Sequence, residues 1–413
     1  MTTHLSPAPV GTRRLLAATD PSLPAHLAGY GPRPPEPELG GLIAAVEAAG
    51  LRGRGGAGFP VGRKLAAVAE GSRAIVVANG AEGEPDSSKD AVLLTRAPHL
   101  VLDGLSAAAA AVGARECHLY APAPVLEPIR RALDERRATG YDTRNIEITA
   151  AADSFLAGEK TAVINRLAGH APIPADQLIS TSRAGLRRRP TLIQNVETLA
   201  HLALIARYGP GWFRSAGTPD EPGTMLLTLS GTTVTGVVEA EFGCGLQDVI
   251  EQSGRIDRRD VRAVLLGGYH GTWIPRAALH RATLSAQALR PLHAHLGAGV
   301  VRVLPRSECG LRATADITAY LAAQSAGRCG PCRNGLPELA ARMHDLAYGA
   351  GGDPREITRL AGLVDGRGAC HHPDGTARLV RSAIDAFGGD LTLHLRGACQ
   401  AEQEHIGRRR PLR

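Results

Sequence analysis

A glycine-rich segment in the first quarter of the chain has the composition of a ligand-binding loop. Residues 50–59 read Gly-Leu-Arg-Gly-Arg-Gly-Gly-Ala-Gly-Phe, and positions 53–58 satisfy the pattern G-x-G-x-x-G. A dinucleotide fingerprint follows a strand, whereas this segment follows helical spacing that starts at Leu39, so an ordinary Rossmann site is disfavoured. The glycines still permit positive φ and inward-facing N–H groups, and Lys64 would add a point charge for a phosphate. The alternative is a tight helix–helix turn with a surface lysine.

A second polar segment follows a buried-type strand. The apolar run at residues 74–78 precedes Asn-Gly-Ala-Glu-Gly-Glu-Pro at 79–85. The carboxyl ends of strands in open α/β sheets present ligand-binding groups. Asn79 offers a donor and an acceptor to a planar amide edge, and Glu82 and Glu84 can accept from ring N–H groups or ribose hydroxyls. The alternative is a solvated acidic turn.

The cysteines suggest a metal or cluster site in the last quarter of the chain. Cys329-Gly-Pro-Cys332 is followed at a distance by Cys370-His371-His372. Three thiols at this spacing suit an iron–sulfur cluster, and with a histidine they suit a Cys₃His zinc site. Cys117 is predicted to be a core thiol, while Cys244 and Cys399 lack neighbours at ligand spacing and require no function.

Composition limits the class of protein. The chain has 413 residues, which predicts two to four domains, and its formal net charge is +7. Aromatic residues make up only 3%, too few for single-strand stacking platforms, so nucleic-acid binding is not expected. The N-terminus lacks a signal pattern and no stretch reaches the roughly 18 apolar residues of a membrane span. We therefore expect a cytoplasmic protein without direct membrane insertion.

The periodicity of apolar residues predicts an α/β fold with additional domains. Strands alternate with helices up to about residue 210, then short strands surround one helix at 246–252, and residues 314–387 are helical. We expect five parts, and they are a flexible segment at 1–38, an α/β domain at 39–215, a small β-rich domain at 220–300, a helical bundle at 310–395 and a basic tail at 396–413.

Several motifs in a fixed order resemble one family. Residues 50–59 and 79–85 resemble its glycine loop and its Asn-Ala-Asp-Glu-Gly-Glu-Pro segment, and 157–162 and 190–198 resemble its Cys-Gly-Glu-Glu-Thr-Ala and Pro-Thr…Asn-Asn-Val-Glu-Thr segments. Cys329–Arg333 and Gly368–Cys370 resemble its iron–sulfur ligands. The family is the flavin-bearing, NADH-oxidising subunit of respiratory complex I, with relatives in NAD-reducing hydrogenases and formate dehydrogenases.

The resemblance implies the fold, the cofactors and the site residues. It implies a Rossmann-like domain for FMN and NADH, a β-grasp (ubiquitin-like, SLBB-type) domain and a helical bundle that holds a [4Fe–4S] cluster. By the match, metal ligands would be Cys329, Cys332 and Cys370. The residues expected to contact FMN or NAD(H) are Gly53, Arg54, Gly55, Gly56, Phe59, Lys64, Asn79, Glu82, Glu84, Gly158, Glu159, Lys160, Asn195 and Thr198.

The sequence also departs from the family pattern. Ala81 replaces an aspartate near the flavin, and Lys160 replaces a glutamate, which suggests that NADPH is accepted. In the cluster motif the first ligand is Ala326, so the fourth iron would bind His371, His372, Cys309 or a small molecule, unless the site holds three irons or none.

These observations predict an NAD(P)H dehydrogenase subunit. Hydride would pass from NADH to FMN, and single electrons would pass through the cluster to a ferredoxin-like or membrane partner, so that the chain lies in the cytoplasm or peripheral to a membrane. Two alternatives are an FMN-binding scaffold or sensor without hydride chemistry and a zinc-stapled interaction protein.

Overall fold

The computed structural model describes residues 13–35, 41–176, 179–349 and 351–403. The chain divides into two compact units. Of the described residues, the N-terminal unit comprises those up to Leu227 together with Val237–Cys244, and the C-terminal unit comprises Thr228–Gly236 and those from Gly245 onward. The mixed α/β fold with a helical C-terminal part is confirmed. Residues 404–413 of the predicted basic tail lie outside the described residues.

The N-terminal unit contains a four-stranded parallel sheet with strand order β3-β2-β1-β4. Its strands are β1 (Ile75–Asn79), β2 (Glu116–Ala121), β3 (Ile146–Ala150) and β4 (Thr191–Asn195). The chain steps outward from β1 to β3 and then returns to the other side of β1 as β4. Asn79 and Asn195, the last residues of β1 and β4, are paired in register. The topological switch point, where such sheets bind ligands, therefore lies between these two strand ends.

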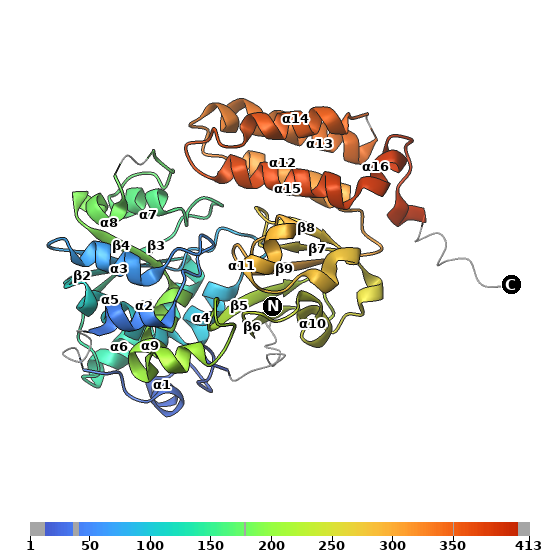
Figure 1. The fold of residues 1–413 in the computed structure, drawn as a ribbon. Helices are drawn as coiled ribbons and strands as arrows, with labels where there is room; N and C mark the ends of the chain where they lie inside the picture. The colour runs from blue at the N-terminus through green and yellow to red at the C-terminus, as the bar shows by residue number, and fades with distance from the viewer. Residues whose placement is uncertain (1–12, 36–40, 177–178, 350, 404–413) are drawn as a thin grey trace. The chain divides into compact units, whose positions relative to one another are not determined.

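Helices cover both faces of this sheet because side chains alternate along each strand (Figure 1). Val76 and Ala78 of β1 join the larger core, while Ile75 and Val77 join a smaller cluster on the other face. The larger core contains residues of α2 (Leu42–Ala49), α3 (Val61–Ala69), α4 (Lys89–Arg96), α5 (Pro98–Ala111), α6 (Leu126–Ala138) and α9 (Val196–Arg214). The smaller cluster contains residues of α7 (Lys160–Leu167) and of the 3-10 helix Leu186–Arg188.

The described part of the N-terminal segment differs from the flexible lead-in expected over residues 1–38. Residues 13–35 include α1 (Leu23–Tyr30), and Leu15 is fully buried. His26 Nε2 lies 2.8 Å from Asp103 Oδ2 in the core. Proline and arginine content suggested mobility, but scattered apolar side chains dock this segment. The remaining short elements of the unit are the 3-10 helix Ala123–Val125 and α8 (Thr181–Ala184).

The second sheet is mixed and has strand order β6-β5-β9-β7-β8. Strands β5 and β9 are parallel, whereas β7 is antiparallel to β8 and β9. The strands are β5 (Thr224–Ser230), β6 (Gly236–Glu241), β7 (Val261–Leu266), β8 (Thr272–Pro275) and β9 (Val300–Pro305). Helix α10 (Leu246–Gln252) has the predicted bounds, and short helices follow at Arg258–Asp260, Arg276–Arg281, α11 (Ala286–Leu289) and Arg290–Leu292.

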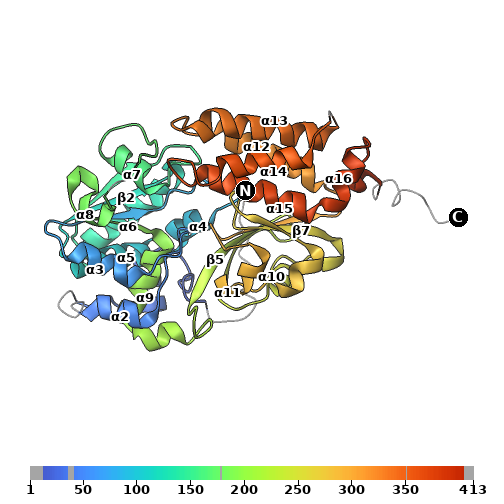
Figure 2. The same ribbon diagram turned by 45° about the horizontal axis from the view of Figure 1, so that its top comes forward.

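The C-terminal helices form a bundle, which Figures 1 and 2 show from two directions. Its members are α12 (Gly310–Ala323), α13 (Leu336–Tyr348), α14 (Pro354–Val364) and α15 (His372–Ala386), with α16 (Gly388–His394) following. A π-helical turn, Pro331–Gly335, precedes α13 and contains Cys332. None of the helices within the described residues has the length and apolar character needed to cross a bilayer.

Candidate functional site

Two asparagines mark the switch point of the parallel sheet. Asn79 donates from Nδ2 to the carbonyl of Gly158 at 3.0 Å and accepts from the Ala81 N–H at 3.2 Å. Asn195 caps α9 by accepting from the Glu197 N–H at 3.0 Å. The bond from Asn79 ties the end of β1 to the loop before α7, and β1 is paired with β4 at Asn195, so three segments predicted to contact a cofactor meet at one edge of the sheet.

The glycine loop between α2 and α3 lies against the same edge. The Gly53 N–H donates to the Phe59 carbonyl at 2.9 Å and closes the loop. A Cβ on Gly55 would lie 3.3 Å from Asn195 Cβ, which shows how closely the loop approaches β4. Gly56 has φ 98°, a conformation that favours glycine. The Phe59 side chain is 55% exposed, which suits a stacking surface for an aromatic ligand.

Arg54 and Thr198 bind each other rather than project freely. The Arg54 N–H donates to Thr198 Oγ1 at 2.8 Å. The Arg54 guanidinium donates to the Thr224 carbonyl at 3.1 Å and lies 4.5 Å from the centre of the Phe242 ring. The side chain of Arg54 is therefore held by the protein, and we expect it to position the loop rather than to contact the cofactor through its charge.

A cluster of buried charged side chains contacts the end of β4 at Asn195. Lys89 Nζ lies 2.7 Å from Asp90 Oδ1 and 2.9 Å from Glu197 Oε2, and Asn195 Nδ2 donates to Asp90 Oδ2 at 2.6 Å. Burial alone would lower the pKa of Lys89, but Asp90, Glu197 and Glu82 raise it above its usual value. Lys89 therefore stays charged and joins α4 to α9.

Two predicted ligand-binding glutamates act as helix caps in this structure. Glu82 accepts from the N–H groups of Asp90 and Ala91 at 3.0 and 3.1 Å, at the start of α4. Glu159 accepts from the N–H groups of Thr161 and Ala162 at 2.8 and 3.1 Å, at the start of α7. With α9, three helix N-termini meet this edge of the sheet, and their dipoles favour a bound anion. The motifs predicted that both glutamates belong to the site, but they could not show whether each carboxylate caps a helix or contacts a ligand.

Two lysines add positive charge to the same region. Lys64 in α3 is half-buried and donates to the Ile193 carbonyl of β4. Burial, and to a smaller extent the charge of Lys160, lowers the pKa of Lys64 to about 8. Lys160 is exposed at the first position of α7. A phosphate beside these lysines would compensate both charges, so the residues present fit the phosphate of FMN.

Close backbone packing explains the glycines of the remaining segments. A Cβ on Gly83 would lie 2.3 Å from the Phe155 carbonyl oxygen, and one on Gly158 would lie 3.1 Å from that of Ala81. The loop with Asn79 and the loop before α7 thus require small residues where they touch. Glu84 is half-buried in the first of these loops, and Ala81 stands in the same loop at the position for which the motif resemblance predicts an aspartate.

The three predicted metal-ligating cysteines gather at the start of α13 and before α15. Cys332 is 3% exposed, while Cys329 and Cys370 are half-buried. Burial, together with Cys329 and Cys370, raises the pKa of the Cys332 thiol to about 12. Three thiols close enough to affect one another's protonation are a donor set that suits iron–sulfur or zinc chemistry.

Two of the residues predicted as possible ligands of the fourth iron contact other groups in the structure. His372 donates from Nε2 to the Leu321 carbonyl at 2.8 Å, and its Nδ1 lies 3.1 Å from His270 Nε2. Cys309 lies 3.2 Å from His394 Nε2 in a different group. His371 is fully exposed beside Cys370 and pairs with Asp374 at 3.1 Å. Among the protein groups considered, His371 is the one left with an accessible ring.

Comparison with known proteins identifies two regions of the chain as members of known domain families. Residues 46–204 match the family described as the Nuo51 FMN-binding domain, and residues 312–394 match the NADH-ubiquinone oxidoreductase-F iron–sulfur binding region. An F-type NADH-quinone oxidoreductase subunit of Rhizobium meliloti is 32% identical over 373 residues, covering 86% of this chain and 88% of the relative. The F-type subunit of Streptomyces coelicolor is 30% identical, covering 86% and 83%.

A solved structure shares the whole fold. The NAD⁺-reducing [NiFe]-hydrogenase in its air-oxidised state superposes with a TM-score of 0.85 at 27% identity, covering 98% of this chain and 71% of that one. The resemblance predicted from the motifs is confirmed, as are FMN and iron–sulfur binding as the chemistry of the two matched regions. The chain belongs to the family of F-type NADH-quinone oxidoreductase subunits, the FMN- and iron–sulfur-binding flavoproteins of NADH dehydrogenases.

Proposed function

We propose that this chain binds NADH beside FMN at the β1/β4 switch point and delivers electrons through the Cys329–Cys332–Cys370 site to another electron-transfer protein. The observation that carries this proposal is the register pairing of Asn79 with Asn195, which brings the two strand-end motifs to one sheet edge. When bound, FMN supplies the redox chemistry, because a flavin accepts two electrons as hydride and releases them singly.

The residues of the chain divide into ligand-binding and positioning groups. Gly53, Gly55 and Gly56 allow the backbone to approach a ring, while Lys64 and Lys160 hold a phosphate by charge. Phe59 offers its exposed face to the nucleotide, and Glu84 lies in the loop that the family uses for NADH. Glu82, Glu159 and Asn195 fix three helix N-termini around the same place, Gly158 and Asn79 tie the loops together, and Arg54 and Thr198 hold the glycine loop on α9.

The finer domain organisation belongs to this proposal. We assign FMN and NAD(P)H binding to residues 39–215, a β-grasp module of the SLBB type to 220–300 and the iron–sulfur bundle to 310–395. The mixed sheet with α10 supports the second assignment. The NAD⁺-reducing [NiFe]-hydrogenase, as its name says, couples NAD⁺ reduction to hydrogenase chemistry, which supports a ferredoxin-like or membrane redox partner here. We expect the chain in the cytoplasm, peripheral to a membrane through that partner.

The visible spectrum of the anaerobically purified chain tests the function. Flavin bands that bleach on addition of NADH, followed by reduction of an added ferredoxin-like protein, are expected. Lys64→Met should retain much less FMN through purification, whereas the exposed neighbour Arg63→Met should retain it fully. Unbleached flavin would instead support a scaffold or sensor, and a colourless protein would contradict the proposal.

A parallel titration with NADPH tests the nucleotide preference suggested by Lys160. If Lys160 contacts the additional phosphate, NADPH should bleach the flavin at concentrations similar to NADH. Bleaching by NADH alone would assign Lys160 to the FMN side of the site.

A further inference from the structure

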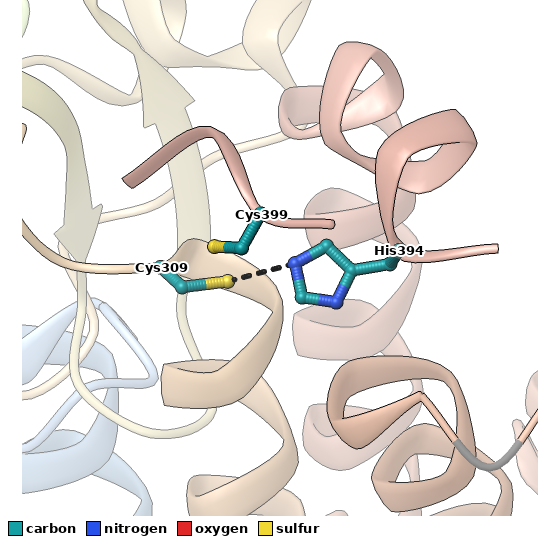
Figure 3. Close-up of side chains that lie close together, drawn as sticks. All are labelled: Cys309, His394 and Cys399. Atoms are coloured by element: carbon teal, nitrogen blue, oxygen red, sulfur yellow. Dashed lines mark hydrogen bonds between the residues drawn. The ribbon is translucent and has the colours of Figure 1, made fainter. Parts of the chain in front are cut away.

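A second cluster of metal-ligating side chains lies outside the region that matches the iron–sulfur family. Cys309, His394 and Cys399 place their ligand atoms within 4.8 Å of one another (Figure 3). All three are buried, with 8%, 5% and 1% of their surface exposed. Cys309 and Cys399 fall outside residues 312–394, so the family match does not account for this group.

The distance between Cys309 and His394 in this cluster is close to the distance between two ligand atoms of a tetrahedral zinc site. Cys309 Sγ lies 3.2 Å from His394 Nε2. In tetrahedral zinc sites, Zn–S bonds of about 2.3 Å and Zn–N bonds of about 2.0–2.1 Å separate sulfur from nitrogen by about 3.5 Å. A small outward movement of one side chain would therefore admit the ion.

The fold builds this cluster from three positions. Cys309 is the N-cap residue of α12, His394 is the last residue of α16, and Cys399 follows the turn after α16. Gly397 adopts φ 70° in that turn, and the Ala398 N–H donates to the Leu393 carbonyl at 2.9 Å. The buried Asp390 accepts from the Gln400 N–H at 3.0 Å. The turn is thus fixed by its own hydrogen bonds and directs Cys399 back toward Cys309.

Close packing brings α12 to the start of α16. A Cβ on Gly310 would lie 2.2 Å from the Phe387 ring, so only glycine fits directly after Cys309. The Arg312 and Leu311 N–H groups, in the first turn of α12, approach the Cys309 sulfur and favour its thiolate. A divalent cation bound to Cys309 and Cys399 would displace the thiol protons and compensate the negative charge of the two buried thiolates.

The donor set selects the kind of metal. Two thiols and one imidazole are borderline-soft ligands, which suit Zn²⁺ and do not suit Ca²⁺ or Mg²⁺. A cavity of about 740 Å³ beside Cys309, lined by Arg312, Asp316, Tyr348 and Glu402 among others, provides access for the ion. Water entering from this side can complete the fourth position of a tetrahedral site.

We propose that Cys309, His394 and Cys399 bind a Zn²⁺ ion that joins the start of α12 to the end of α16 and keeps its fourth position for water. The three-ligand site is separate from the Cys329, Cys332 and Cys370 site, which the sequence alone allowed to be zinc. Cys309 is thereby assigned to zinc and not to the fourth iron, and Cys399, for which the sequence indicated no function, becomes a ligand.

Metal analysis of the full-length chain, purified anaerobically in a reducing buffer, tests the proposal. The wild type should contain about one zinc per chain in addition to iron. Cys399→Ser and His394→Gln should each reduce zinc at least tenfold with iron unchanged. Two matched controls, Cys244→Ser and Cys332→Ser, should keep the zinc, and the second should lose iron instead.

A measurement on the wild type keeps the proposal testable if the variants fail to fold. Cobalt(II) added to the zinc-depleted chain should give sulfur-to-cobalt charge-transfer absorption that one equivalent of zinc abolishes. Three results would overturn the proposal. The first is a wild type without zinc or cobalt binding. The second is zinc lost from Cys332→Ser but not from Cys399→Ser. The third is a proteolytic fragment, two hydrogens lighter before reduction, that joins Cys309 to Cys399 by a disulfide.

Discussion

The switch-point site of the N-terminal unit and the motif cysteines of the C-terminal unit both depart from their family, but with different consequences. At the switch point, Ala81 stands where the family motif predicts a carboxylate, while backbone N–H groups that donate to Asn79, Glu82, Glu159 and Asn195 still hold the loops. At the cysteines, Ala326 stands where the family motif predicts a ligand. A site built from many weak contacts tolerates the loss of one, whereas a coordination shell has a fixed number of positions.

The same comparison explains where each region is vulnerable. The flavin site depends on its scaffold, in which a few buried charges join separate helices, more than on any one ligand contact. The cysteine site depends on the ligands themselves, because a cubane takes four. Substitutions in the two regions should therefore differ in what they disrupt, and the largest effect is expected in the scaffold.

Removing the buried ammonium should damage the switch-point scaffold most. Lys89→Met would leave Asp90 and Glu197 as uncompensated buried carboxylates. Breaking one partner of a buried ion pair typically costs about 3–5 kcal/mol of unfolding free energy. Chemical denaturation of the N-terminal transition measures this loss. The exposed Lys160→Met should change it by less than about 0.5 kcal/mol. Equal stability of both variants would contradict a scaffold role for Lys89.

Restoring the missing cysteine should strengthen the cluster. Ala326→Cys would supply a fourth thiolate beside Cys329, Cys332 and Cys370. If the present site holds a cluster with three protein ligands, iron content after brief air exposure should rise from about three toward about four atoms per chain. Iron analysis and low-temperature electron paramagnetic resonance check the result. Ala323→Cys, at the last residue of α12, is the matched control and should leave iron unchanged.

Protonation of Lys64 should control FMN affinity. Its pKa of about 8 in the free protein means that it carries charge below pH 8 and loses it above. A bound phosphate raises that pKa, so FMN affinity should be highest below pH 8 and fall about tenfold between about pH 7.5 and 9.5. Fluorescence titration of the FMN-depleted chain across this range measures the change. Lys64→Met should bind weakly with no decline, and a parallel decline in that variant would assign the titration to another group.

The family motifs predicted that Asn79 and Asn195 belong to one site, and the structure pairs these residues at the ends of β1 and β4. Asn79 follows the buried apolar run at 74–78, whereas Asn195 follows Thr-Leu-Ile-Gln and was placed in the site by the motif resemblance alone. The capping roles of Glu82 and Glu159 could not be predicted, since a carboxylate before a helix can bind either N–H groups or a ligand. The buried docking of residues 13–35 was also missed, because composition does not report which apolar side chains find a partner.

The two cysteine clusters show the same limit more sharply. Cys329 and Cys332 are close in sequence, and their spacing indicates that both bind the same metal ion or cluster. Cys309 and His394 are separated by 85 residues, and only the packing of α12 against the segment at Phe387 brings them together. Local spacing predicts a site within one element, whereas a site assembled by packing requires the fold.

Reversing the charge at residue 160 should have the smallest effect on FMN binding. This variant measures how far the switch-point site tolerates a changed charge. Lys160→Glu restores the carboxylate of the family motif at an exposed position beside Lys64. Because exposed charges contribute about 0.2–1 kcal/mol, FMN affinity at pH 7 should fall only about two- to fivefold. The negative charge should also raise the pKa of Lys64, so the decline in affinity would begin at higher pH, with the neutral Lys160→Gln intermediate. Tighter FMN binding by Lys160→Glu would show that the positive charge of Lys160 does not attract the FMN phosphate. The tolerance of the flavin site to the loss of one contact would then be explained only by the buried scaffold around Lys89.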